Sequence, residues 1–254
     1  MKKLFPAFAF VAVACGGGGG GGIERQAPAP LAPLRESLQG SQSATVLVLG
    51  DSTGDERWEW VHGFARKLVD RYPGYEVRLV DWDRANDTYR DPVTYGQVGS
   101  SLVLTIYNGS IASATIDTWL APSREGRLLP SQPVQLVLVS ASHNHGAQVG
   151  EEWTKRLDRV ESQLARRYPG SQHTYLTQNP RSEPASYREQ HATRRTELLA
   201  WAKRRTLATV DVFAAYPSLV GEYLDGAGIH PRAAGQQIWI DAMAAAFDLT
   251  SSPK

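Results

Sequence analysis

The sequence contains a single cysteine and almost no net charge, and both absences narrow the possible functions. Cys15 is the only cysteine, so an intramolecular disulfide is excluded. The 27 lysine and arginine residues are balanced by 26 aspartate and glutamate residues, which leaves a net charge of +1. Such a chain has no overall field that would attract nucleic acid or an anionic membrane surface. We therefore expect no nucleic-acid partner.

Long hydrophobic runs, internal repeats and nucleotide-binding loops are also missing. The apolar stretch over residues 4–14 is too short to cross a bilayer as a helix. No segment matches a P-loop or a dinucleotide-binding pattern. His143 and His145 stand close together, but no third metal ligand lies near them in the sequence. We predict neither a cofactor nor a metal site.

The first 40 residues are predicted to precede the folded domain. Lysines at the start, an apolar stretch and the sequence Ala12-Val13-Ala14-Cys15 resemble a lipoprotein signal, which implies a lipid attached to Cys15. Residues 16–22 are all glycine, as in a flexible tether. We predict a signal peptide over residues 1–15, a linker over 16–40 and an exported, membrane-anchored domain over 41–254. Secretion without an anchor is the alternative.

Strand and helix patterns alternate along the third segment. Short aliphatic runs at residues 44–49 and 133–140 predict buried strands, and apolar residues at helical spacing over 151–168 predict an amphipathic helix. Alternation of this kind favours a parallel sheet with helices on both faces. About 210 residues are enough for one such domain with a sizeable core. We therefore predict an α/β fold.

Polar residues at two distant points of the chain carry the functional prediction. Gly50-Asp51-Ser52 directly follows the strand predicted over residues 44–49. In an open parallel sheet, ligands bind beyond the carboxyl ends of the strands. Asp225 and His230 share a loop near the other end of the chain. Histidine can take the proton of a serine hydroxyl, and a carboxylate can orient the imidazole, so these residues supply the parts of a catalytic triad.

Two more strand ends could donate hydrogen bonds to an oxyanion. Asn144 follows the strand predicted over 133–140 and carries a side-chain amide. The strand that begins at residue 102 runs into a turn of small residues over 108–115, where backbone N–H groups can be exposed.

With these four segments, the chain resembles the SGNH (GDSL-type) hydrolase family over about residues 45–248. The resemblance implies a flavodoxin-like, three-layer α/β/α sandwich with five central parallel strands. It implies that Ser52 is the nucleophile, His230 the base and Asp225 the triad acid. It also implies an oxyanion hole formed by the backbone N–H groups of Ser52 and Ser113 and the Asn144 side chain. Several positions depart from the family: Ser113 replaces a glycine, and His143 and His145 differ from the usual neighbours of the oxyanion-hole asparagine. Asp225 also precedes His230 by five residues instead of three.

Four further residues are expected around the site. Asp51 is expected to hold the nucleophile turn, and Trp58 could line the pocket because it follows Ser52 closely. His143 and His145 are expected at the pocket rim, where they could orient Asn144. The segments 83–99 and 178–190 are the expected walls.

These residues predict a serine esterase that hydrolyses acyl esters of the lipid or O-acetylated glycan type through an acyl-enzyme. Its expected partners are the ester substrate and, through Cys15, a membrane. Two alternatives stay open. The same triad could transfer the acyl group to another acceptor, and the chain could be an inactive, surface-tethered binding module. The departures at Ser113 and Asp225 favour the inactive module.

Overall fold

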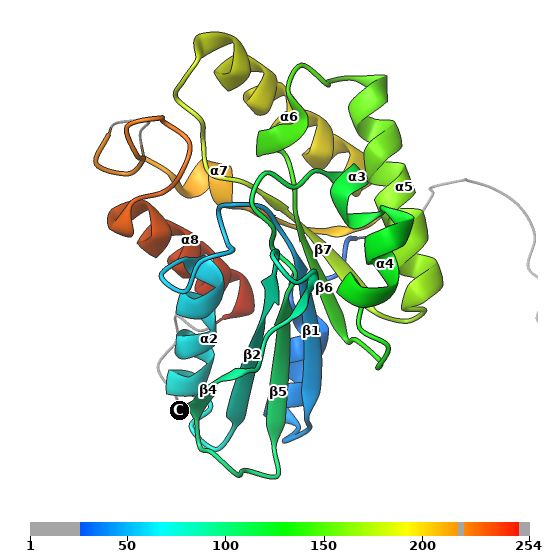
Figure 1. Ribbon diagram of the computed structural model, residues 1–254, viewed down its shortest axis with the longest axis vertical. Helices are drawn as coiled ribbons and strands as arrows, with labels where there is room; N and C mark the ends of the chain where they lie inside the picture. The colour runs from blue at the N-terminus through cyan, green and yellow to red at the C-terminus, as the bar shows by residue number, and fades with distance from the viewer. Residues whose placement is uncertain (1–25, 218–220, 249–254) are drawn as a thin grey trace, which may run out of the picture.

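The computed structural model describes residues 26–217 and 221–248, which form a mostly parallel sheet between two layers of helices (Figure 1). The strands are β1 (Ala44–Leu49), β2 (Glu76–Asp83), β3 (Thr88–Tyr89), β4 (Val93–Gly96), β5 (Val103–Asn108), β6 (Leu136–Ser140), β7 (Gln172–Thr177) and β8 (Ala208–Asp211). The helices are α1 (Ala32–Gln39), α2 (Trp60–Arg71), α3 (Ile116–Trp119), α4 (Pro122–Leu128), α5 (Glu151–Arg167), α6 (Ala185–Arg204), α7 (Val212–Ala215) and α8 (Ala233–Phe247). The predicted α/β fold is confirmed.

Strand β1 lies at the centre of the sheet, where it pairs in parallel with β5 on one side and β6 on the other. Its side chains alternate between two separate cores. Val46 and Val48 belong to one core, and Leu47 and Leu49 belong to the other. A parallel strand that is covered on both faces is apolar at successive positions, and the sequence of β1 has this character.

The two helical layers anchor to the sheet through tryptophans. On the first face, Trp60 of α2 stacks on Trp239 of α8, with ring centroids 5.0 Å apart. On the second face, Trp153 of α5 and Trp201 of α6 lie in the other core. Figure 1 shows α2 and α8 on one side of the sheet and α4 and α5 on the opposite side. These four tryptophans are therefore structural anchors and do not line a site.

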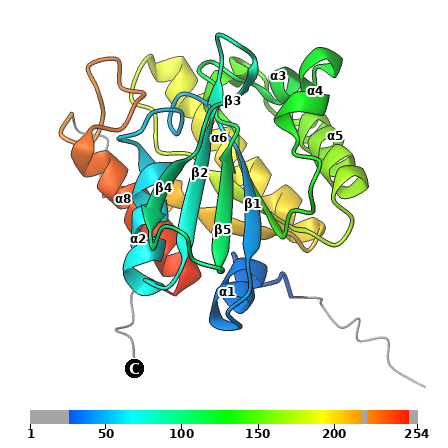
Figure 2. The same cartoon turned by 60° about the horizontal axis from the view of Figure 1, so that its bottom comes forward.

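Helix α1 forms within the segment that was predicted to be a flexible linker. Leu31, Leu34 and Leu38 are at most 3% exposed and join the core of the first face. Figure 2 shows α1 below the amino end of β1. The linker prediction is wrong for residues 32–39, because leucines at helical spacing bury an apolar face there. The predicted signal peptide and Cys15 lie outside the described residues, in which no helix is long and apolar enough to cross a membrane.

The sheet differs from the prediction in its number of strands and in their order. In the described part of the chain, six strands run parallel (β2, β5, β1, β6, β7 and β8), one more than expected. The order also differs from the flavodoxin order, because β5 lies between β2 and β1. The segment 83–99 contributes β3 and β4, which pair antiparallel with β2 and cover that edge of the sheet.

The chain leaves neighbouring central strands toward opposite faces. Strand β1 leads to α2 on the first face, whereas the adjacent β6 leads to α5 on the second face. Such a change of direction opens a crevice beyond the carboxyl ends of the two strands. Ser52 follows β1 and Asn144 follows β6, so both residues lie at this crevice.

Candidate active site

The turn after β1 holds Ser52 in a fixed backbone position. A Cβ atom at Gly50 would lie 2.4 Å from the Ser110 hydroxyl oxygen, so no larger residue fits without displacing Ser110. The Gly50 carbonyl accepts hydrogen bonds from the Ile111 N–H at 3.1 Å and from the Trp119 indole at 3.2 Å. Ser52 itself is half-buried at the sheet edge.

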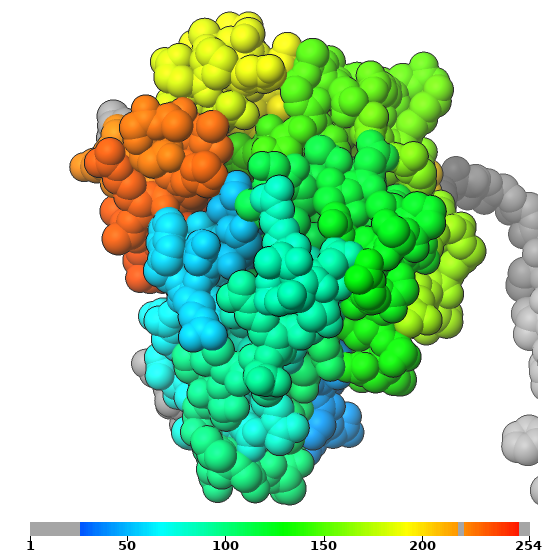
Figure 3. Space-filling model, viewed as in Figure 1, coloured from blue at the N-terminus to red at the C-terminus, as the bar shows by residue number. Residues whose placement is uncertain are grey.

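The structure brings Ser52, His230 and Asp225 into one chain of contacts. The Ser52 hydroxyl oxygen lies 2.9 Å from Nε2 of His230, 178 residues further along the chain. The other ring nitrogen of His230, Nδ1, lies 3.0 Å from Oδ2 of Asp225. In Figure 3, the orange segment that carries His230 borders the blue segment that follows β1. These are the contacts that a serine nucleophile, its base and an orienting acid require.

The loop between Asp225 and His230 folds back so that the Asp225 carboxylate reaches the His230 ring, although the two residues are five positions apart. Oδ1 of Asp225 accepts the backbone N–H of Ile229 at 3.0 Å and that of His230 at 3.2 Å. The backbone of Gly228, at φ 66°, also donates to the Asp225 carbonyl. Burial by itself would raise the pKa of Asp225, but the hydrogen bonds from Ile229 and His230 outweigh it and lower that pKa. The carboxylate is therefore ionised and fixed against the imidazole.

Ser113 lies in the left-handed region, at φ 63°. This conformation favours glycine, the residue at this position in the SGNH family that the chain resembles. A serine at this position costs about 1 kcal/mol. Among the residues that the structure describes, neither the Ser113 N–H nor the Ser52 N–H donates a recorded hydrogen bond. Both backbone donors are available to a ligand.

Asn144 connects the two turns that would form an oxyanion hole. It lies in a short 3₁₀ turn, His143–His145, which begins three residues after the last residue of β6. Its side-chain amide donates to Oδ2 of Asp51 at 3.2 Å and to the Ala114 carbonyl at 3.1 Å. These acceptors are the immediate neighbours of Ser52 and Ser113. Both amide hydrogens are engaged, so an oxyanion would have to replace one of these two acceptors.

Asp51 ties the turn after β1 to its surroundings. The side chain is 1% exposed, and its Oδ1 accepts both the backbone N–H and the hydroxyl of Thr53. Its Oδ2 accepts the amides of Asn144 and Gln178. Burial raises the pKa of Asp51, and hydrogen bonds from Gln178 and Thr53 act in the opposite direction. This arrangement matches the holding role expected of Asp51.

Gln178 is a positioning residue that the sequence analysis missed. It follows β7 and is fully buried. Its amide donates to Oδ2 of Asp51 at 2.9 Å, and its carbonyl oxygen accepts the Ser142 hydroxyl at 3.0 Å and the His143 N–H at 2.6 Å. Gln178 therefore holds the Ser52 turn and the Asn144 turn at a fixed distance. The sequence pattern predicts that Gln178 follows a strand, but it does not predict the direction of the Gln178 side chain.

A second serine–histidine pair lies nearby and lacks the features of a reactive site. The Ser142 hydroxyl is 2.8 Å from Nε2 of His191, but the two residues are only 3% and 1% exposed. Nδ1 of His191 has no hydrogen-bond partner within the described residues, so no carboxylate orients this ring. Burial lowers the pKa of His191 well below its ordinary value. This pair is structural.

The other predicted pocket residues occupy different environments. His143 stacks on His191 and His145 packs on Trp153, with ring centroids 4.3 and 4.7 Å apart. Burial lowers the pKa of His143 to about 3 and that of His145 to about 4, so both rings are neutral. Trp58 is 57% exposed.

The described residues contain no group of three side chains that could hold a metal ion.

A buried carboxyl lies below the loop that follows Ser52. Glu59 is 1% exposed, and its Oε2 accepts the Glu56 N–H at 2.9 Å. Burial raises the pKa of Glu59 to about 9, and nearby Asp55 and Asp51 add to this effect. Between its ordinary value of 4.5 and about 9, the folded protein binds a proton that the unfolded chain has lost. Stability should therefore fall as the pH rises through this range.

We expect Glu59→Gln to remove much of this pH dependence, because glutamine keeps an acceptor for the Glu56 N–H and carries no charge. As the pH rises from 5 to 8, the free energy of unfolding of the variant should increase by about 2–4 kcal/mol relative to that of the parent, because only the parent loses the stability that depends on protonated Glu59. Urea unfolding at the two pH values measures the difference. Exposed Glu36→Gln is the matched control. Parallel pH dependences of the parent and Glu59→Gln would contradict the assignment.

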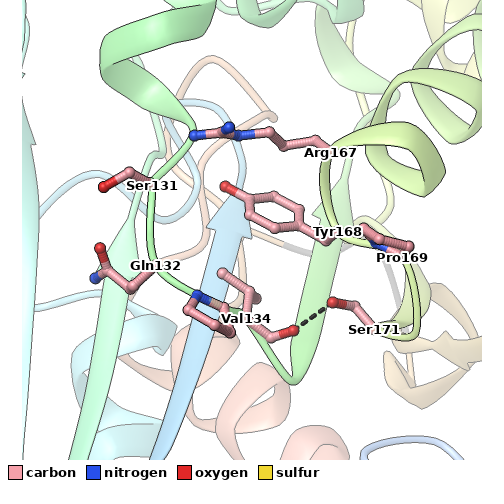
Figure 4. A pocket seen from close by; sticks show the side chains of 8 residues that line it. Ser131, Gln132, Val134, Arg167, Tyr168, Pro169 and Ser171 are labelled. Atoms are coloured by element: carbon pink, nitrogen blue, oxygen red, sulfur yellow. Dashed lines mark hydrogen bonds between the residues drawn. The ribbon is translucent and has the colours of Figure 1, made fainter.

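A hollow lies at the end of the sheet opposite to Ser52 (Figure 4). Its lining residues precede β6 or lie at and after the end of α5, and they include Gln132, Val134, Tyr168 and Ser171. The Ser171 hydroxyl donates to the Val134 carbonyl. Because β6 starts at Leu136, this hollow lies at the amino ends of the strands, away from Ser52.

Comparison with known proteins identifies the fold and leaves the family open. No model of a protein family and no curated protein matches this sequence. The structure is similar to LAE5, an alpha/beta hydrolase enzyme from the metagenome of Lake Arreo, Spain, with a TM-score of 0.58 and 19% identity over 84% of this chain and 99% of that chain. It is also similar to Axe2, an acetylxylan esterase from Geobacillus stearothermophilus. Here the TM-score is 0.60, with 16% identity over 83% of this chain and 97% of that chain. The similarity establishes a shared fold.

Proposed function

We propose that this protein is a serine esterase that hydrolyses acyl esters. The observation that carries the proposal is the sequence of contacts from Asp225 to His230 at 3.0 Å and from His230 to Ser52 at 2.9 Å. The similarity of the fold to an alpha/beta hydrolase and to an acetylxylan esterase supports it.

In the proposed reaction, the Ser52 oxygen attacks the ester carbonyl carbon while Nε2 of His230 takes the hydroxyl proton. The tetrahedral intermediate collapses, the bond to the alcohol oxygen breaks, and His230 returns the proton to the leaving alcohol. A water molecule then attacks the acyl-enzyme, with His230 again as the base. The carboxylic acid leaves and Ser52 regains its proton. Asp225 holds Nδ1 of His230 and stabilises its cationic form.

Three donors are proposed to stabilise the oxyanion of the intermediate. Two of them are the backbone N–H groups of Ser52 and Ser113, which have no acceptor among the described residues. The third is the amide of Asn144, which must exchange one of its present acceptors for the oxyanion. One such donor is worth about 10²–10³-fold in turnover. Asp51 and Gln178 keep Asn144 beside Ser52 and are positioning residues.

The observed loop geometry removes one argument for an inactive binding module. The five-residue spacing raised doubt about Asp225, but its carboxylate contacts the His230 ring directly. Acetylated glycans are the first substrates to examine, because one protein of similar fold is an acetylxylan esterase. Lipid attachment at Cys15 and export of the protein also remain proposals, and lipid attachment would place the site at a membrane surface.

A fluorophosphonate probe tests the proposed function directly. The probe should attach to one serine, and peptide mass spectrometry should locate it at Ser52, because among the described serines only Ser52 contacts a histidine that a carboxylate orients. Ser142 should remain unlabelled, since it is buried and its histidine has no such partner in the described structure. An absence of labelling, or labelling at Ser142, would refute the proposal.

A further inference from the structure

A hollow of about 200 Å³ opens beside Asn144. It is lined by His143, Asn144, Gly146, Arg181 and Tyr187. None of these residues has an aliphatic side chain, so the hollow offers little to an acyl chain. Its polar lining fits the alcohol part of an ester instead.

Among the described residues, Arg181 is the only cation that lines this hollow, and no described carboxylate acts on it. Its guanidinium donates to the Glu183 carbonyl at 2.8 Å and to the His143 carbonyl at 3.4 Å. It also lies 4.8 Å from the centroid of the Tyr187 ring. In the part of the chain that the structure describes, no carboxylate acts on Arg181, and its recorded hydrogen bonds come from Nε and Nη1 and leave Nη2 without an acceptor. The backbone carbonyls therefore hold a cation in place without balancing its charge.

The segment that carries Arg181 is bound to the loop that carries His230. The Asn179 amide donates to the Ile229 carbonyl at 2.8 Å, and the Ser182 N–H donates to the Gly228 carbonyl at 2.9 Å. Figure 3 shows the yellow segment at the start of α6 bordering the orange segment before α8. Arg181 is thus fixed to both the turn of Asn144 and the loop of His230.

Buried polar groups at the hollow have unused hydrogen-bonding capacity. His143 is 2% exposed, and neither of its ring nitrogens has a recorded partner within the described residues. Arg194 is fully buried and donates to the Gly146 carbonyl at 2.6 Å, and nearby Glu197 offsets part of its positive charge. An anion in the hollow would meet a positive field and would find donors on Arg181.

We propose that this hollow binds a carboxylate on the alcohol part of the substrate, with Arg181 as its partner. The inference rests on the proposed esterase function and narrows the substrate class to acyl esters whose alcohol part carries a carboxylate. Tyr187 offers an aromatic face beside the cation, against which a ring of the alcohol can pack.

The test compares two acetyl esters that differ only in charge, 4-acetoxybenzoate and 4-acetoxybenzamide. For each protein, kcat/KM for 4-acetoxybenzoate is divided by kcat/KM for 4-acetoxybenzamide. This ratio should be about ten-fold lower in Arg181→Gln than in the parent, the order expected for the loss of one charge-assisted hydrogen bond. Dividing the parent ratio by the variant ratio cancels the difference in chemical reactivity. Arg188→Gln removes a neighbouring exposed charge that does not line the hollow, and it should keep the parent ratio.

Binding of the product alcohols gives a readout that does not depend on turnover. In a Ser52→Ala background, 4-hydroxybenzoate should bind more tightly than 4-hydroxybenzamide, and Arg181→Gln should remove the difference. Equal binding of the two alcohols, or an unchanged kcat/KM ratio in Arg181→Gln, would overturn the charge preference while leaving an active esterase. Failure of the esterase function itself would instead appear as an absence of fluorophosphonate labelling at Ser52.

Discussion

Ser52→Ala is expected to reduce ester hydrolysis by about 10⁴–10⁶-fold, because it removes the hydroxyl that forms the acyl-enzyme in the proposed reaction. His230 would keep its contact with Asp225 but would have no hydroxyl to deprotonate. The rate of 4-nitrophenyl acetate hydrolysis, corrected for the spontaneous reaction, measures the loss. The urea unfolding midpoint should stay close to that of the parent, since a half-buried hydroxyl contributes little to stability.

Ser142→Ala is the matched control for this loss, because Ser142 also contacts a histidine. It should retain most of the parental turnover, since the Ser142–His191 pair is buried and lacks an orienting carboxylate in the described structure. Near-parental hydrolysis by Ser52→Ala together with a large loss in Ser142→Ala would exchange the roles of the two pairs and contradict the proposal.

Asp225→Asn is expected to reduce kcat by about 10⁴-fold with little change in KM. Asparagine can still accept the N–H groups of Ile229 and His230, so the loop should keep its shape. Its amide would donate to Nδ1 of His230, which places the ring proton on Nε2, the atom that must accept the proton of Ser52. Steady-state kinetics over several ester concentrations separate kcat from KM.

Asp241→Asn supplies the control for Asp225, because it makes the same change at an exposed position of α8. It should leave kcat and KM at parental values. If Asp225→Asn also keeps near-parental turnover, then a different group orients His230 and the assignment of the triad acid fails. A loss of the folded state in Asp225→Asn, detected by circular dichroism, would direct the test to Asp225→Glu.

The sequence predicted the elements of the fold well wherever local pattern decides. Apolar runs located β1 and β6, and helical spacing located α5 to within one residue. Local pattern failed at α1, where a segment preceded by alanine and proline was taken for a linker. The burial of Leu31 and Leu34 depends on a complementary surface of the core, which a sequence pattern does not reveal.

The candidate site divides in the same way between sequence and tertiary structure. By itself, the sequence determined that Ser52, Asn144 and His230 stand at element ends, because strand ends and turns leave local signatures. Only the tertiary structure decided that Asp225 reaches His230 and that Gln178 joins the turns of Ser52 and Asn144. It also decided that Arg181 lines the hollow beside Asn144 with no carboxylate of the described residues acting on it. The physical reason is that these contacts depend on side-chain direction and loop path. Both are set by packing between segments as far apart in the chain as Asp51 and Gln178, which are separated by 127 residues.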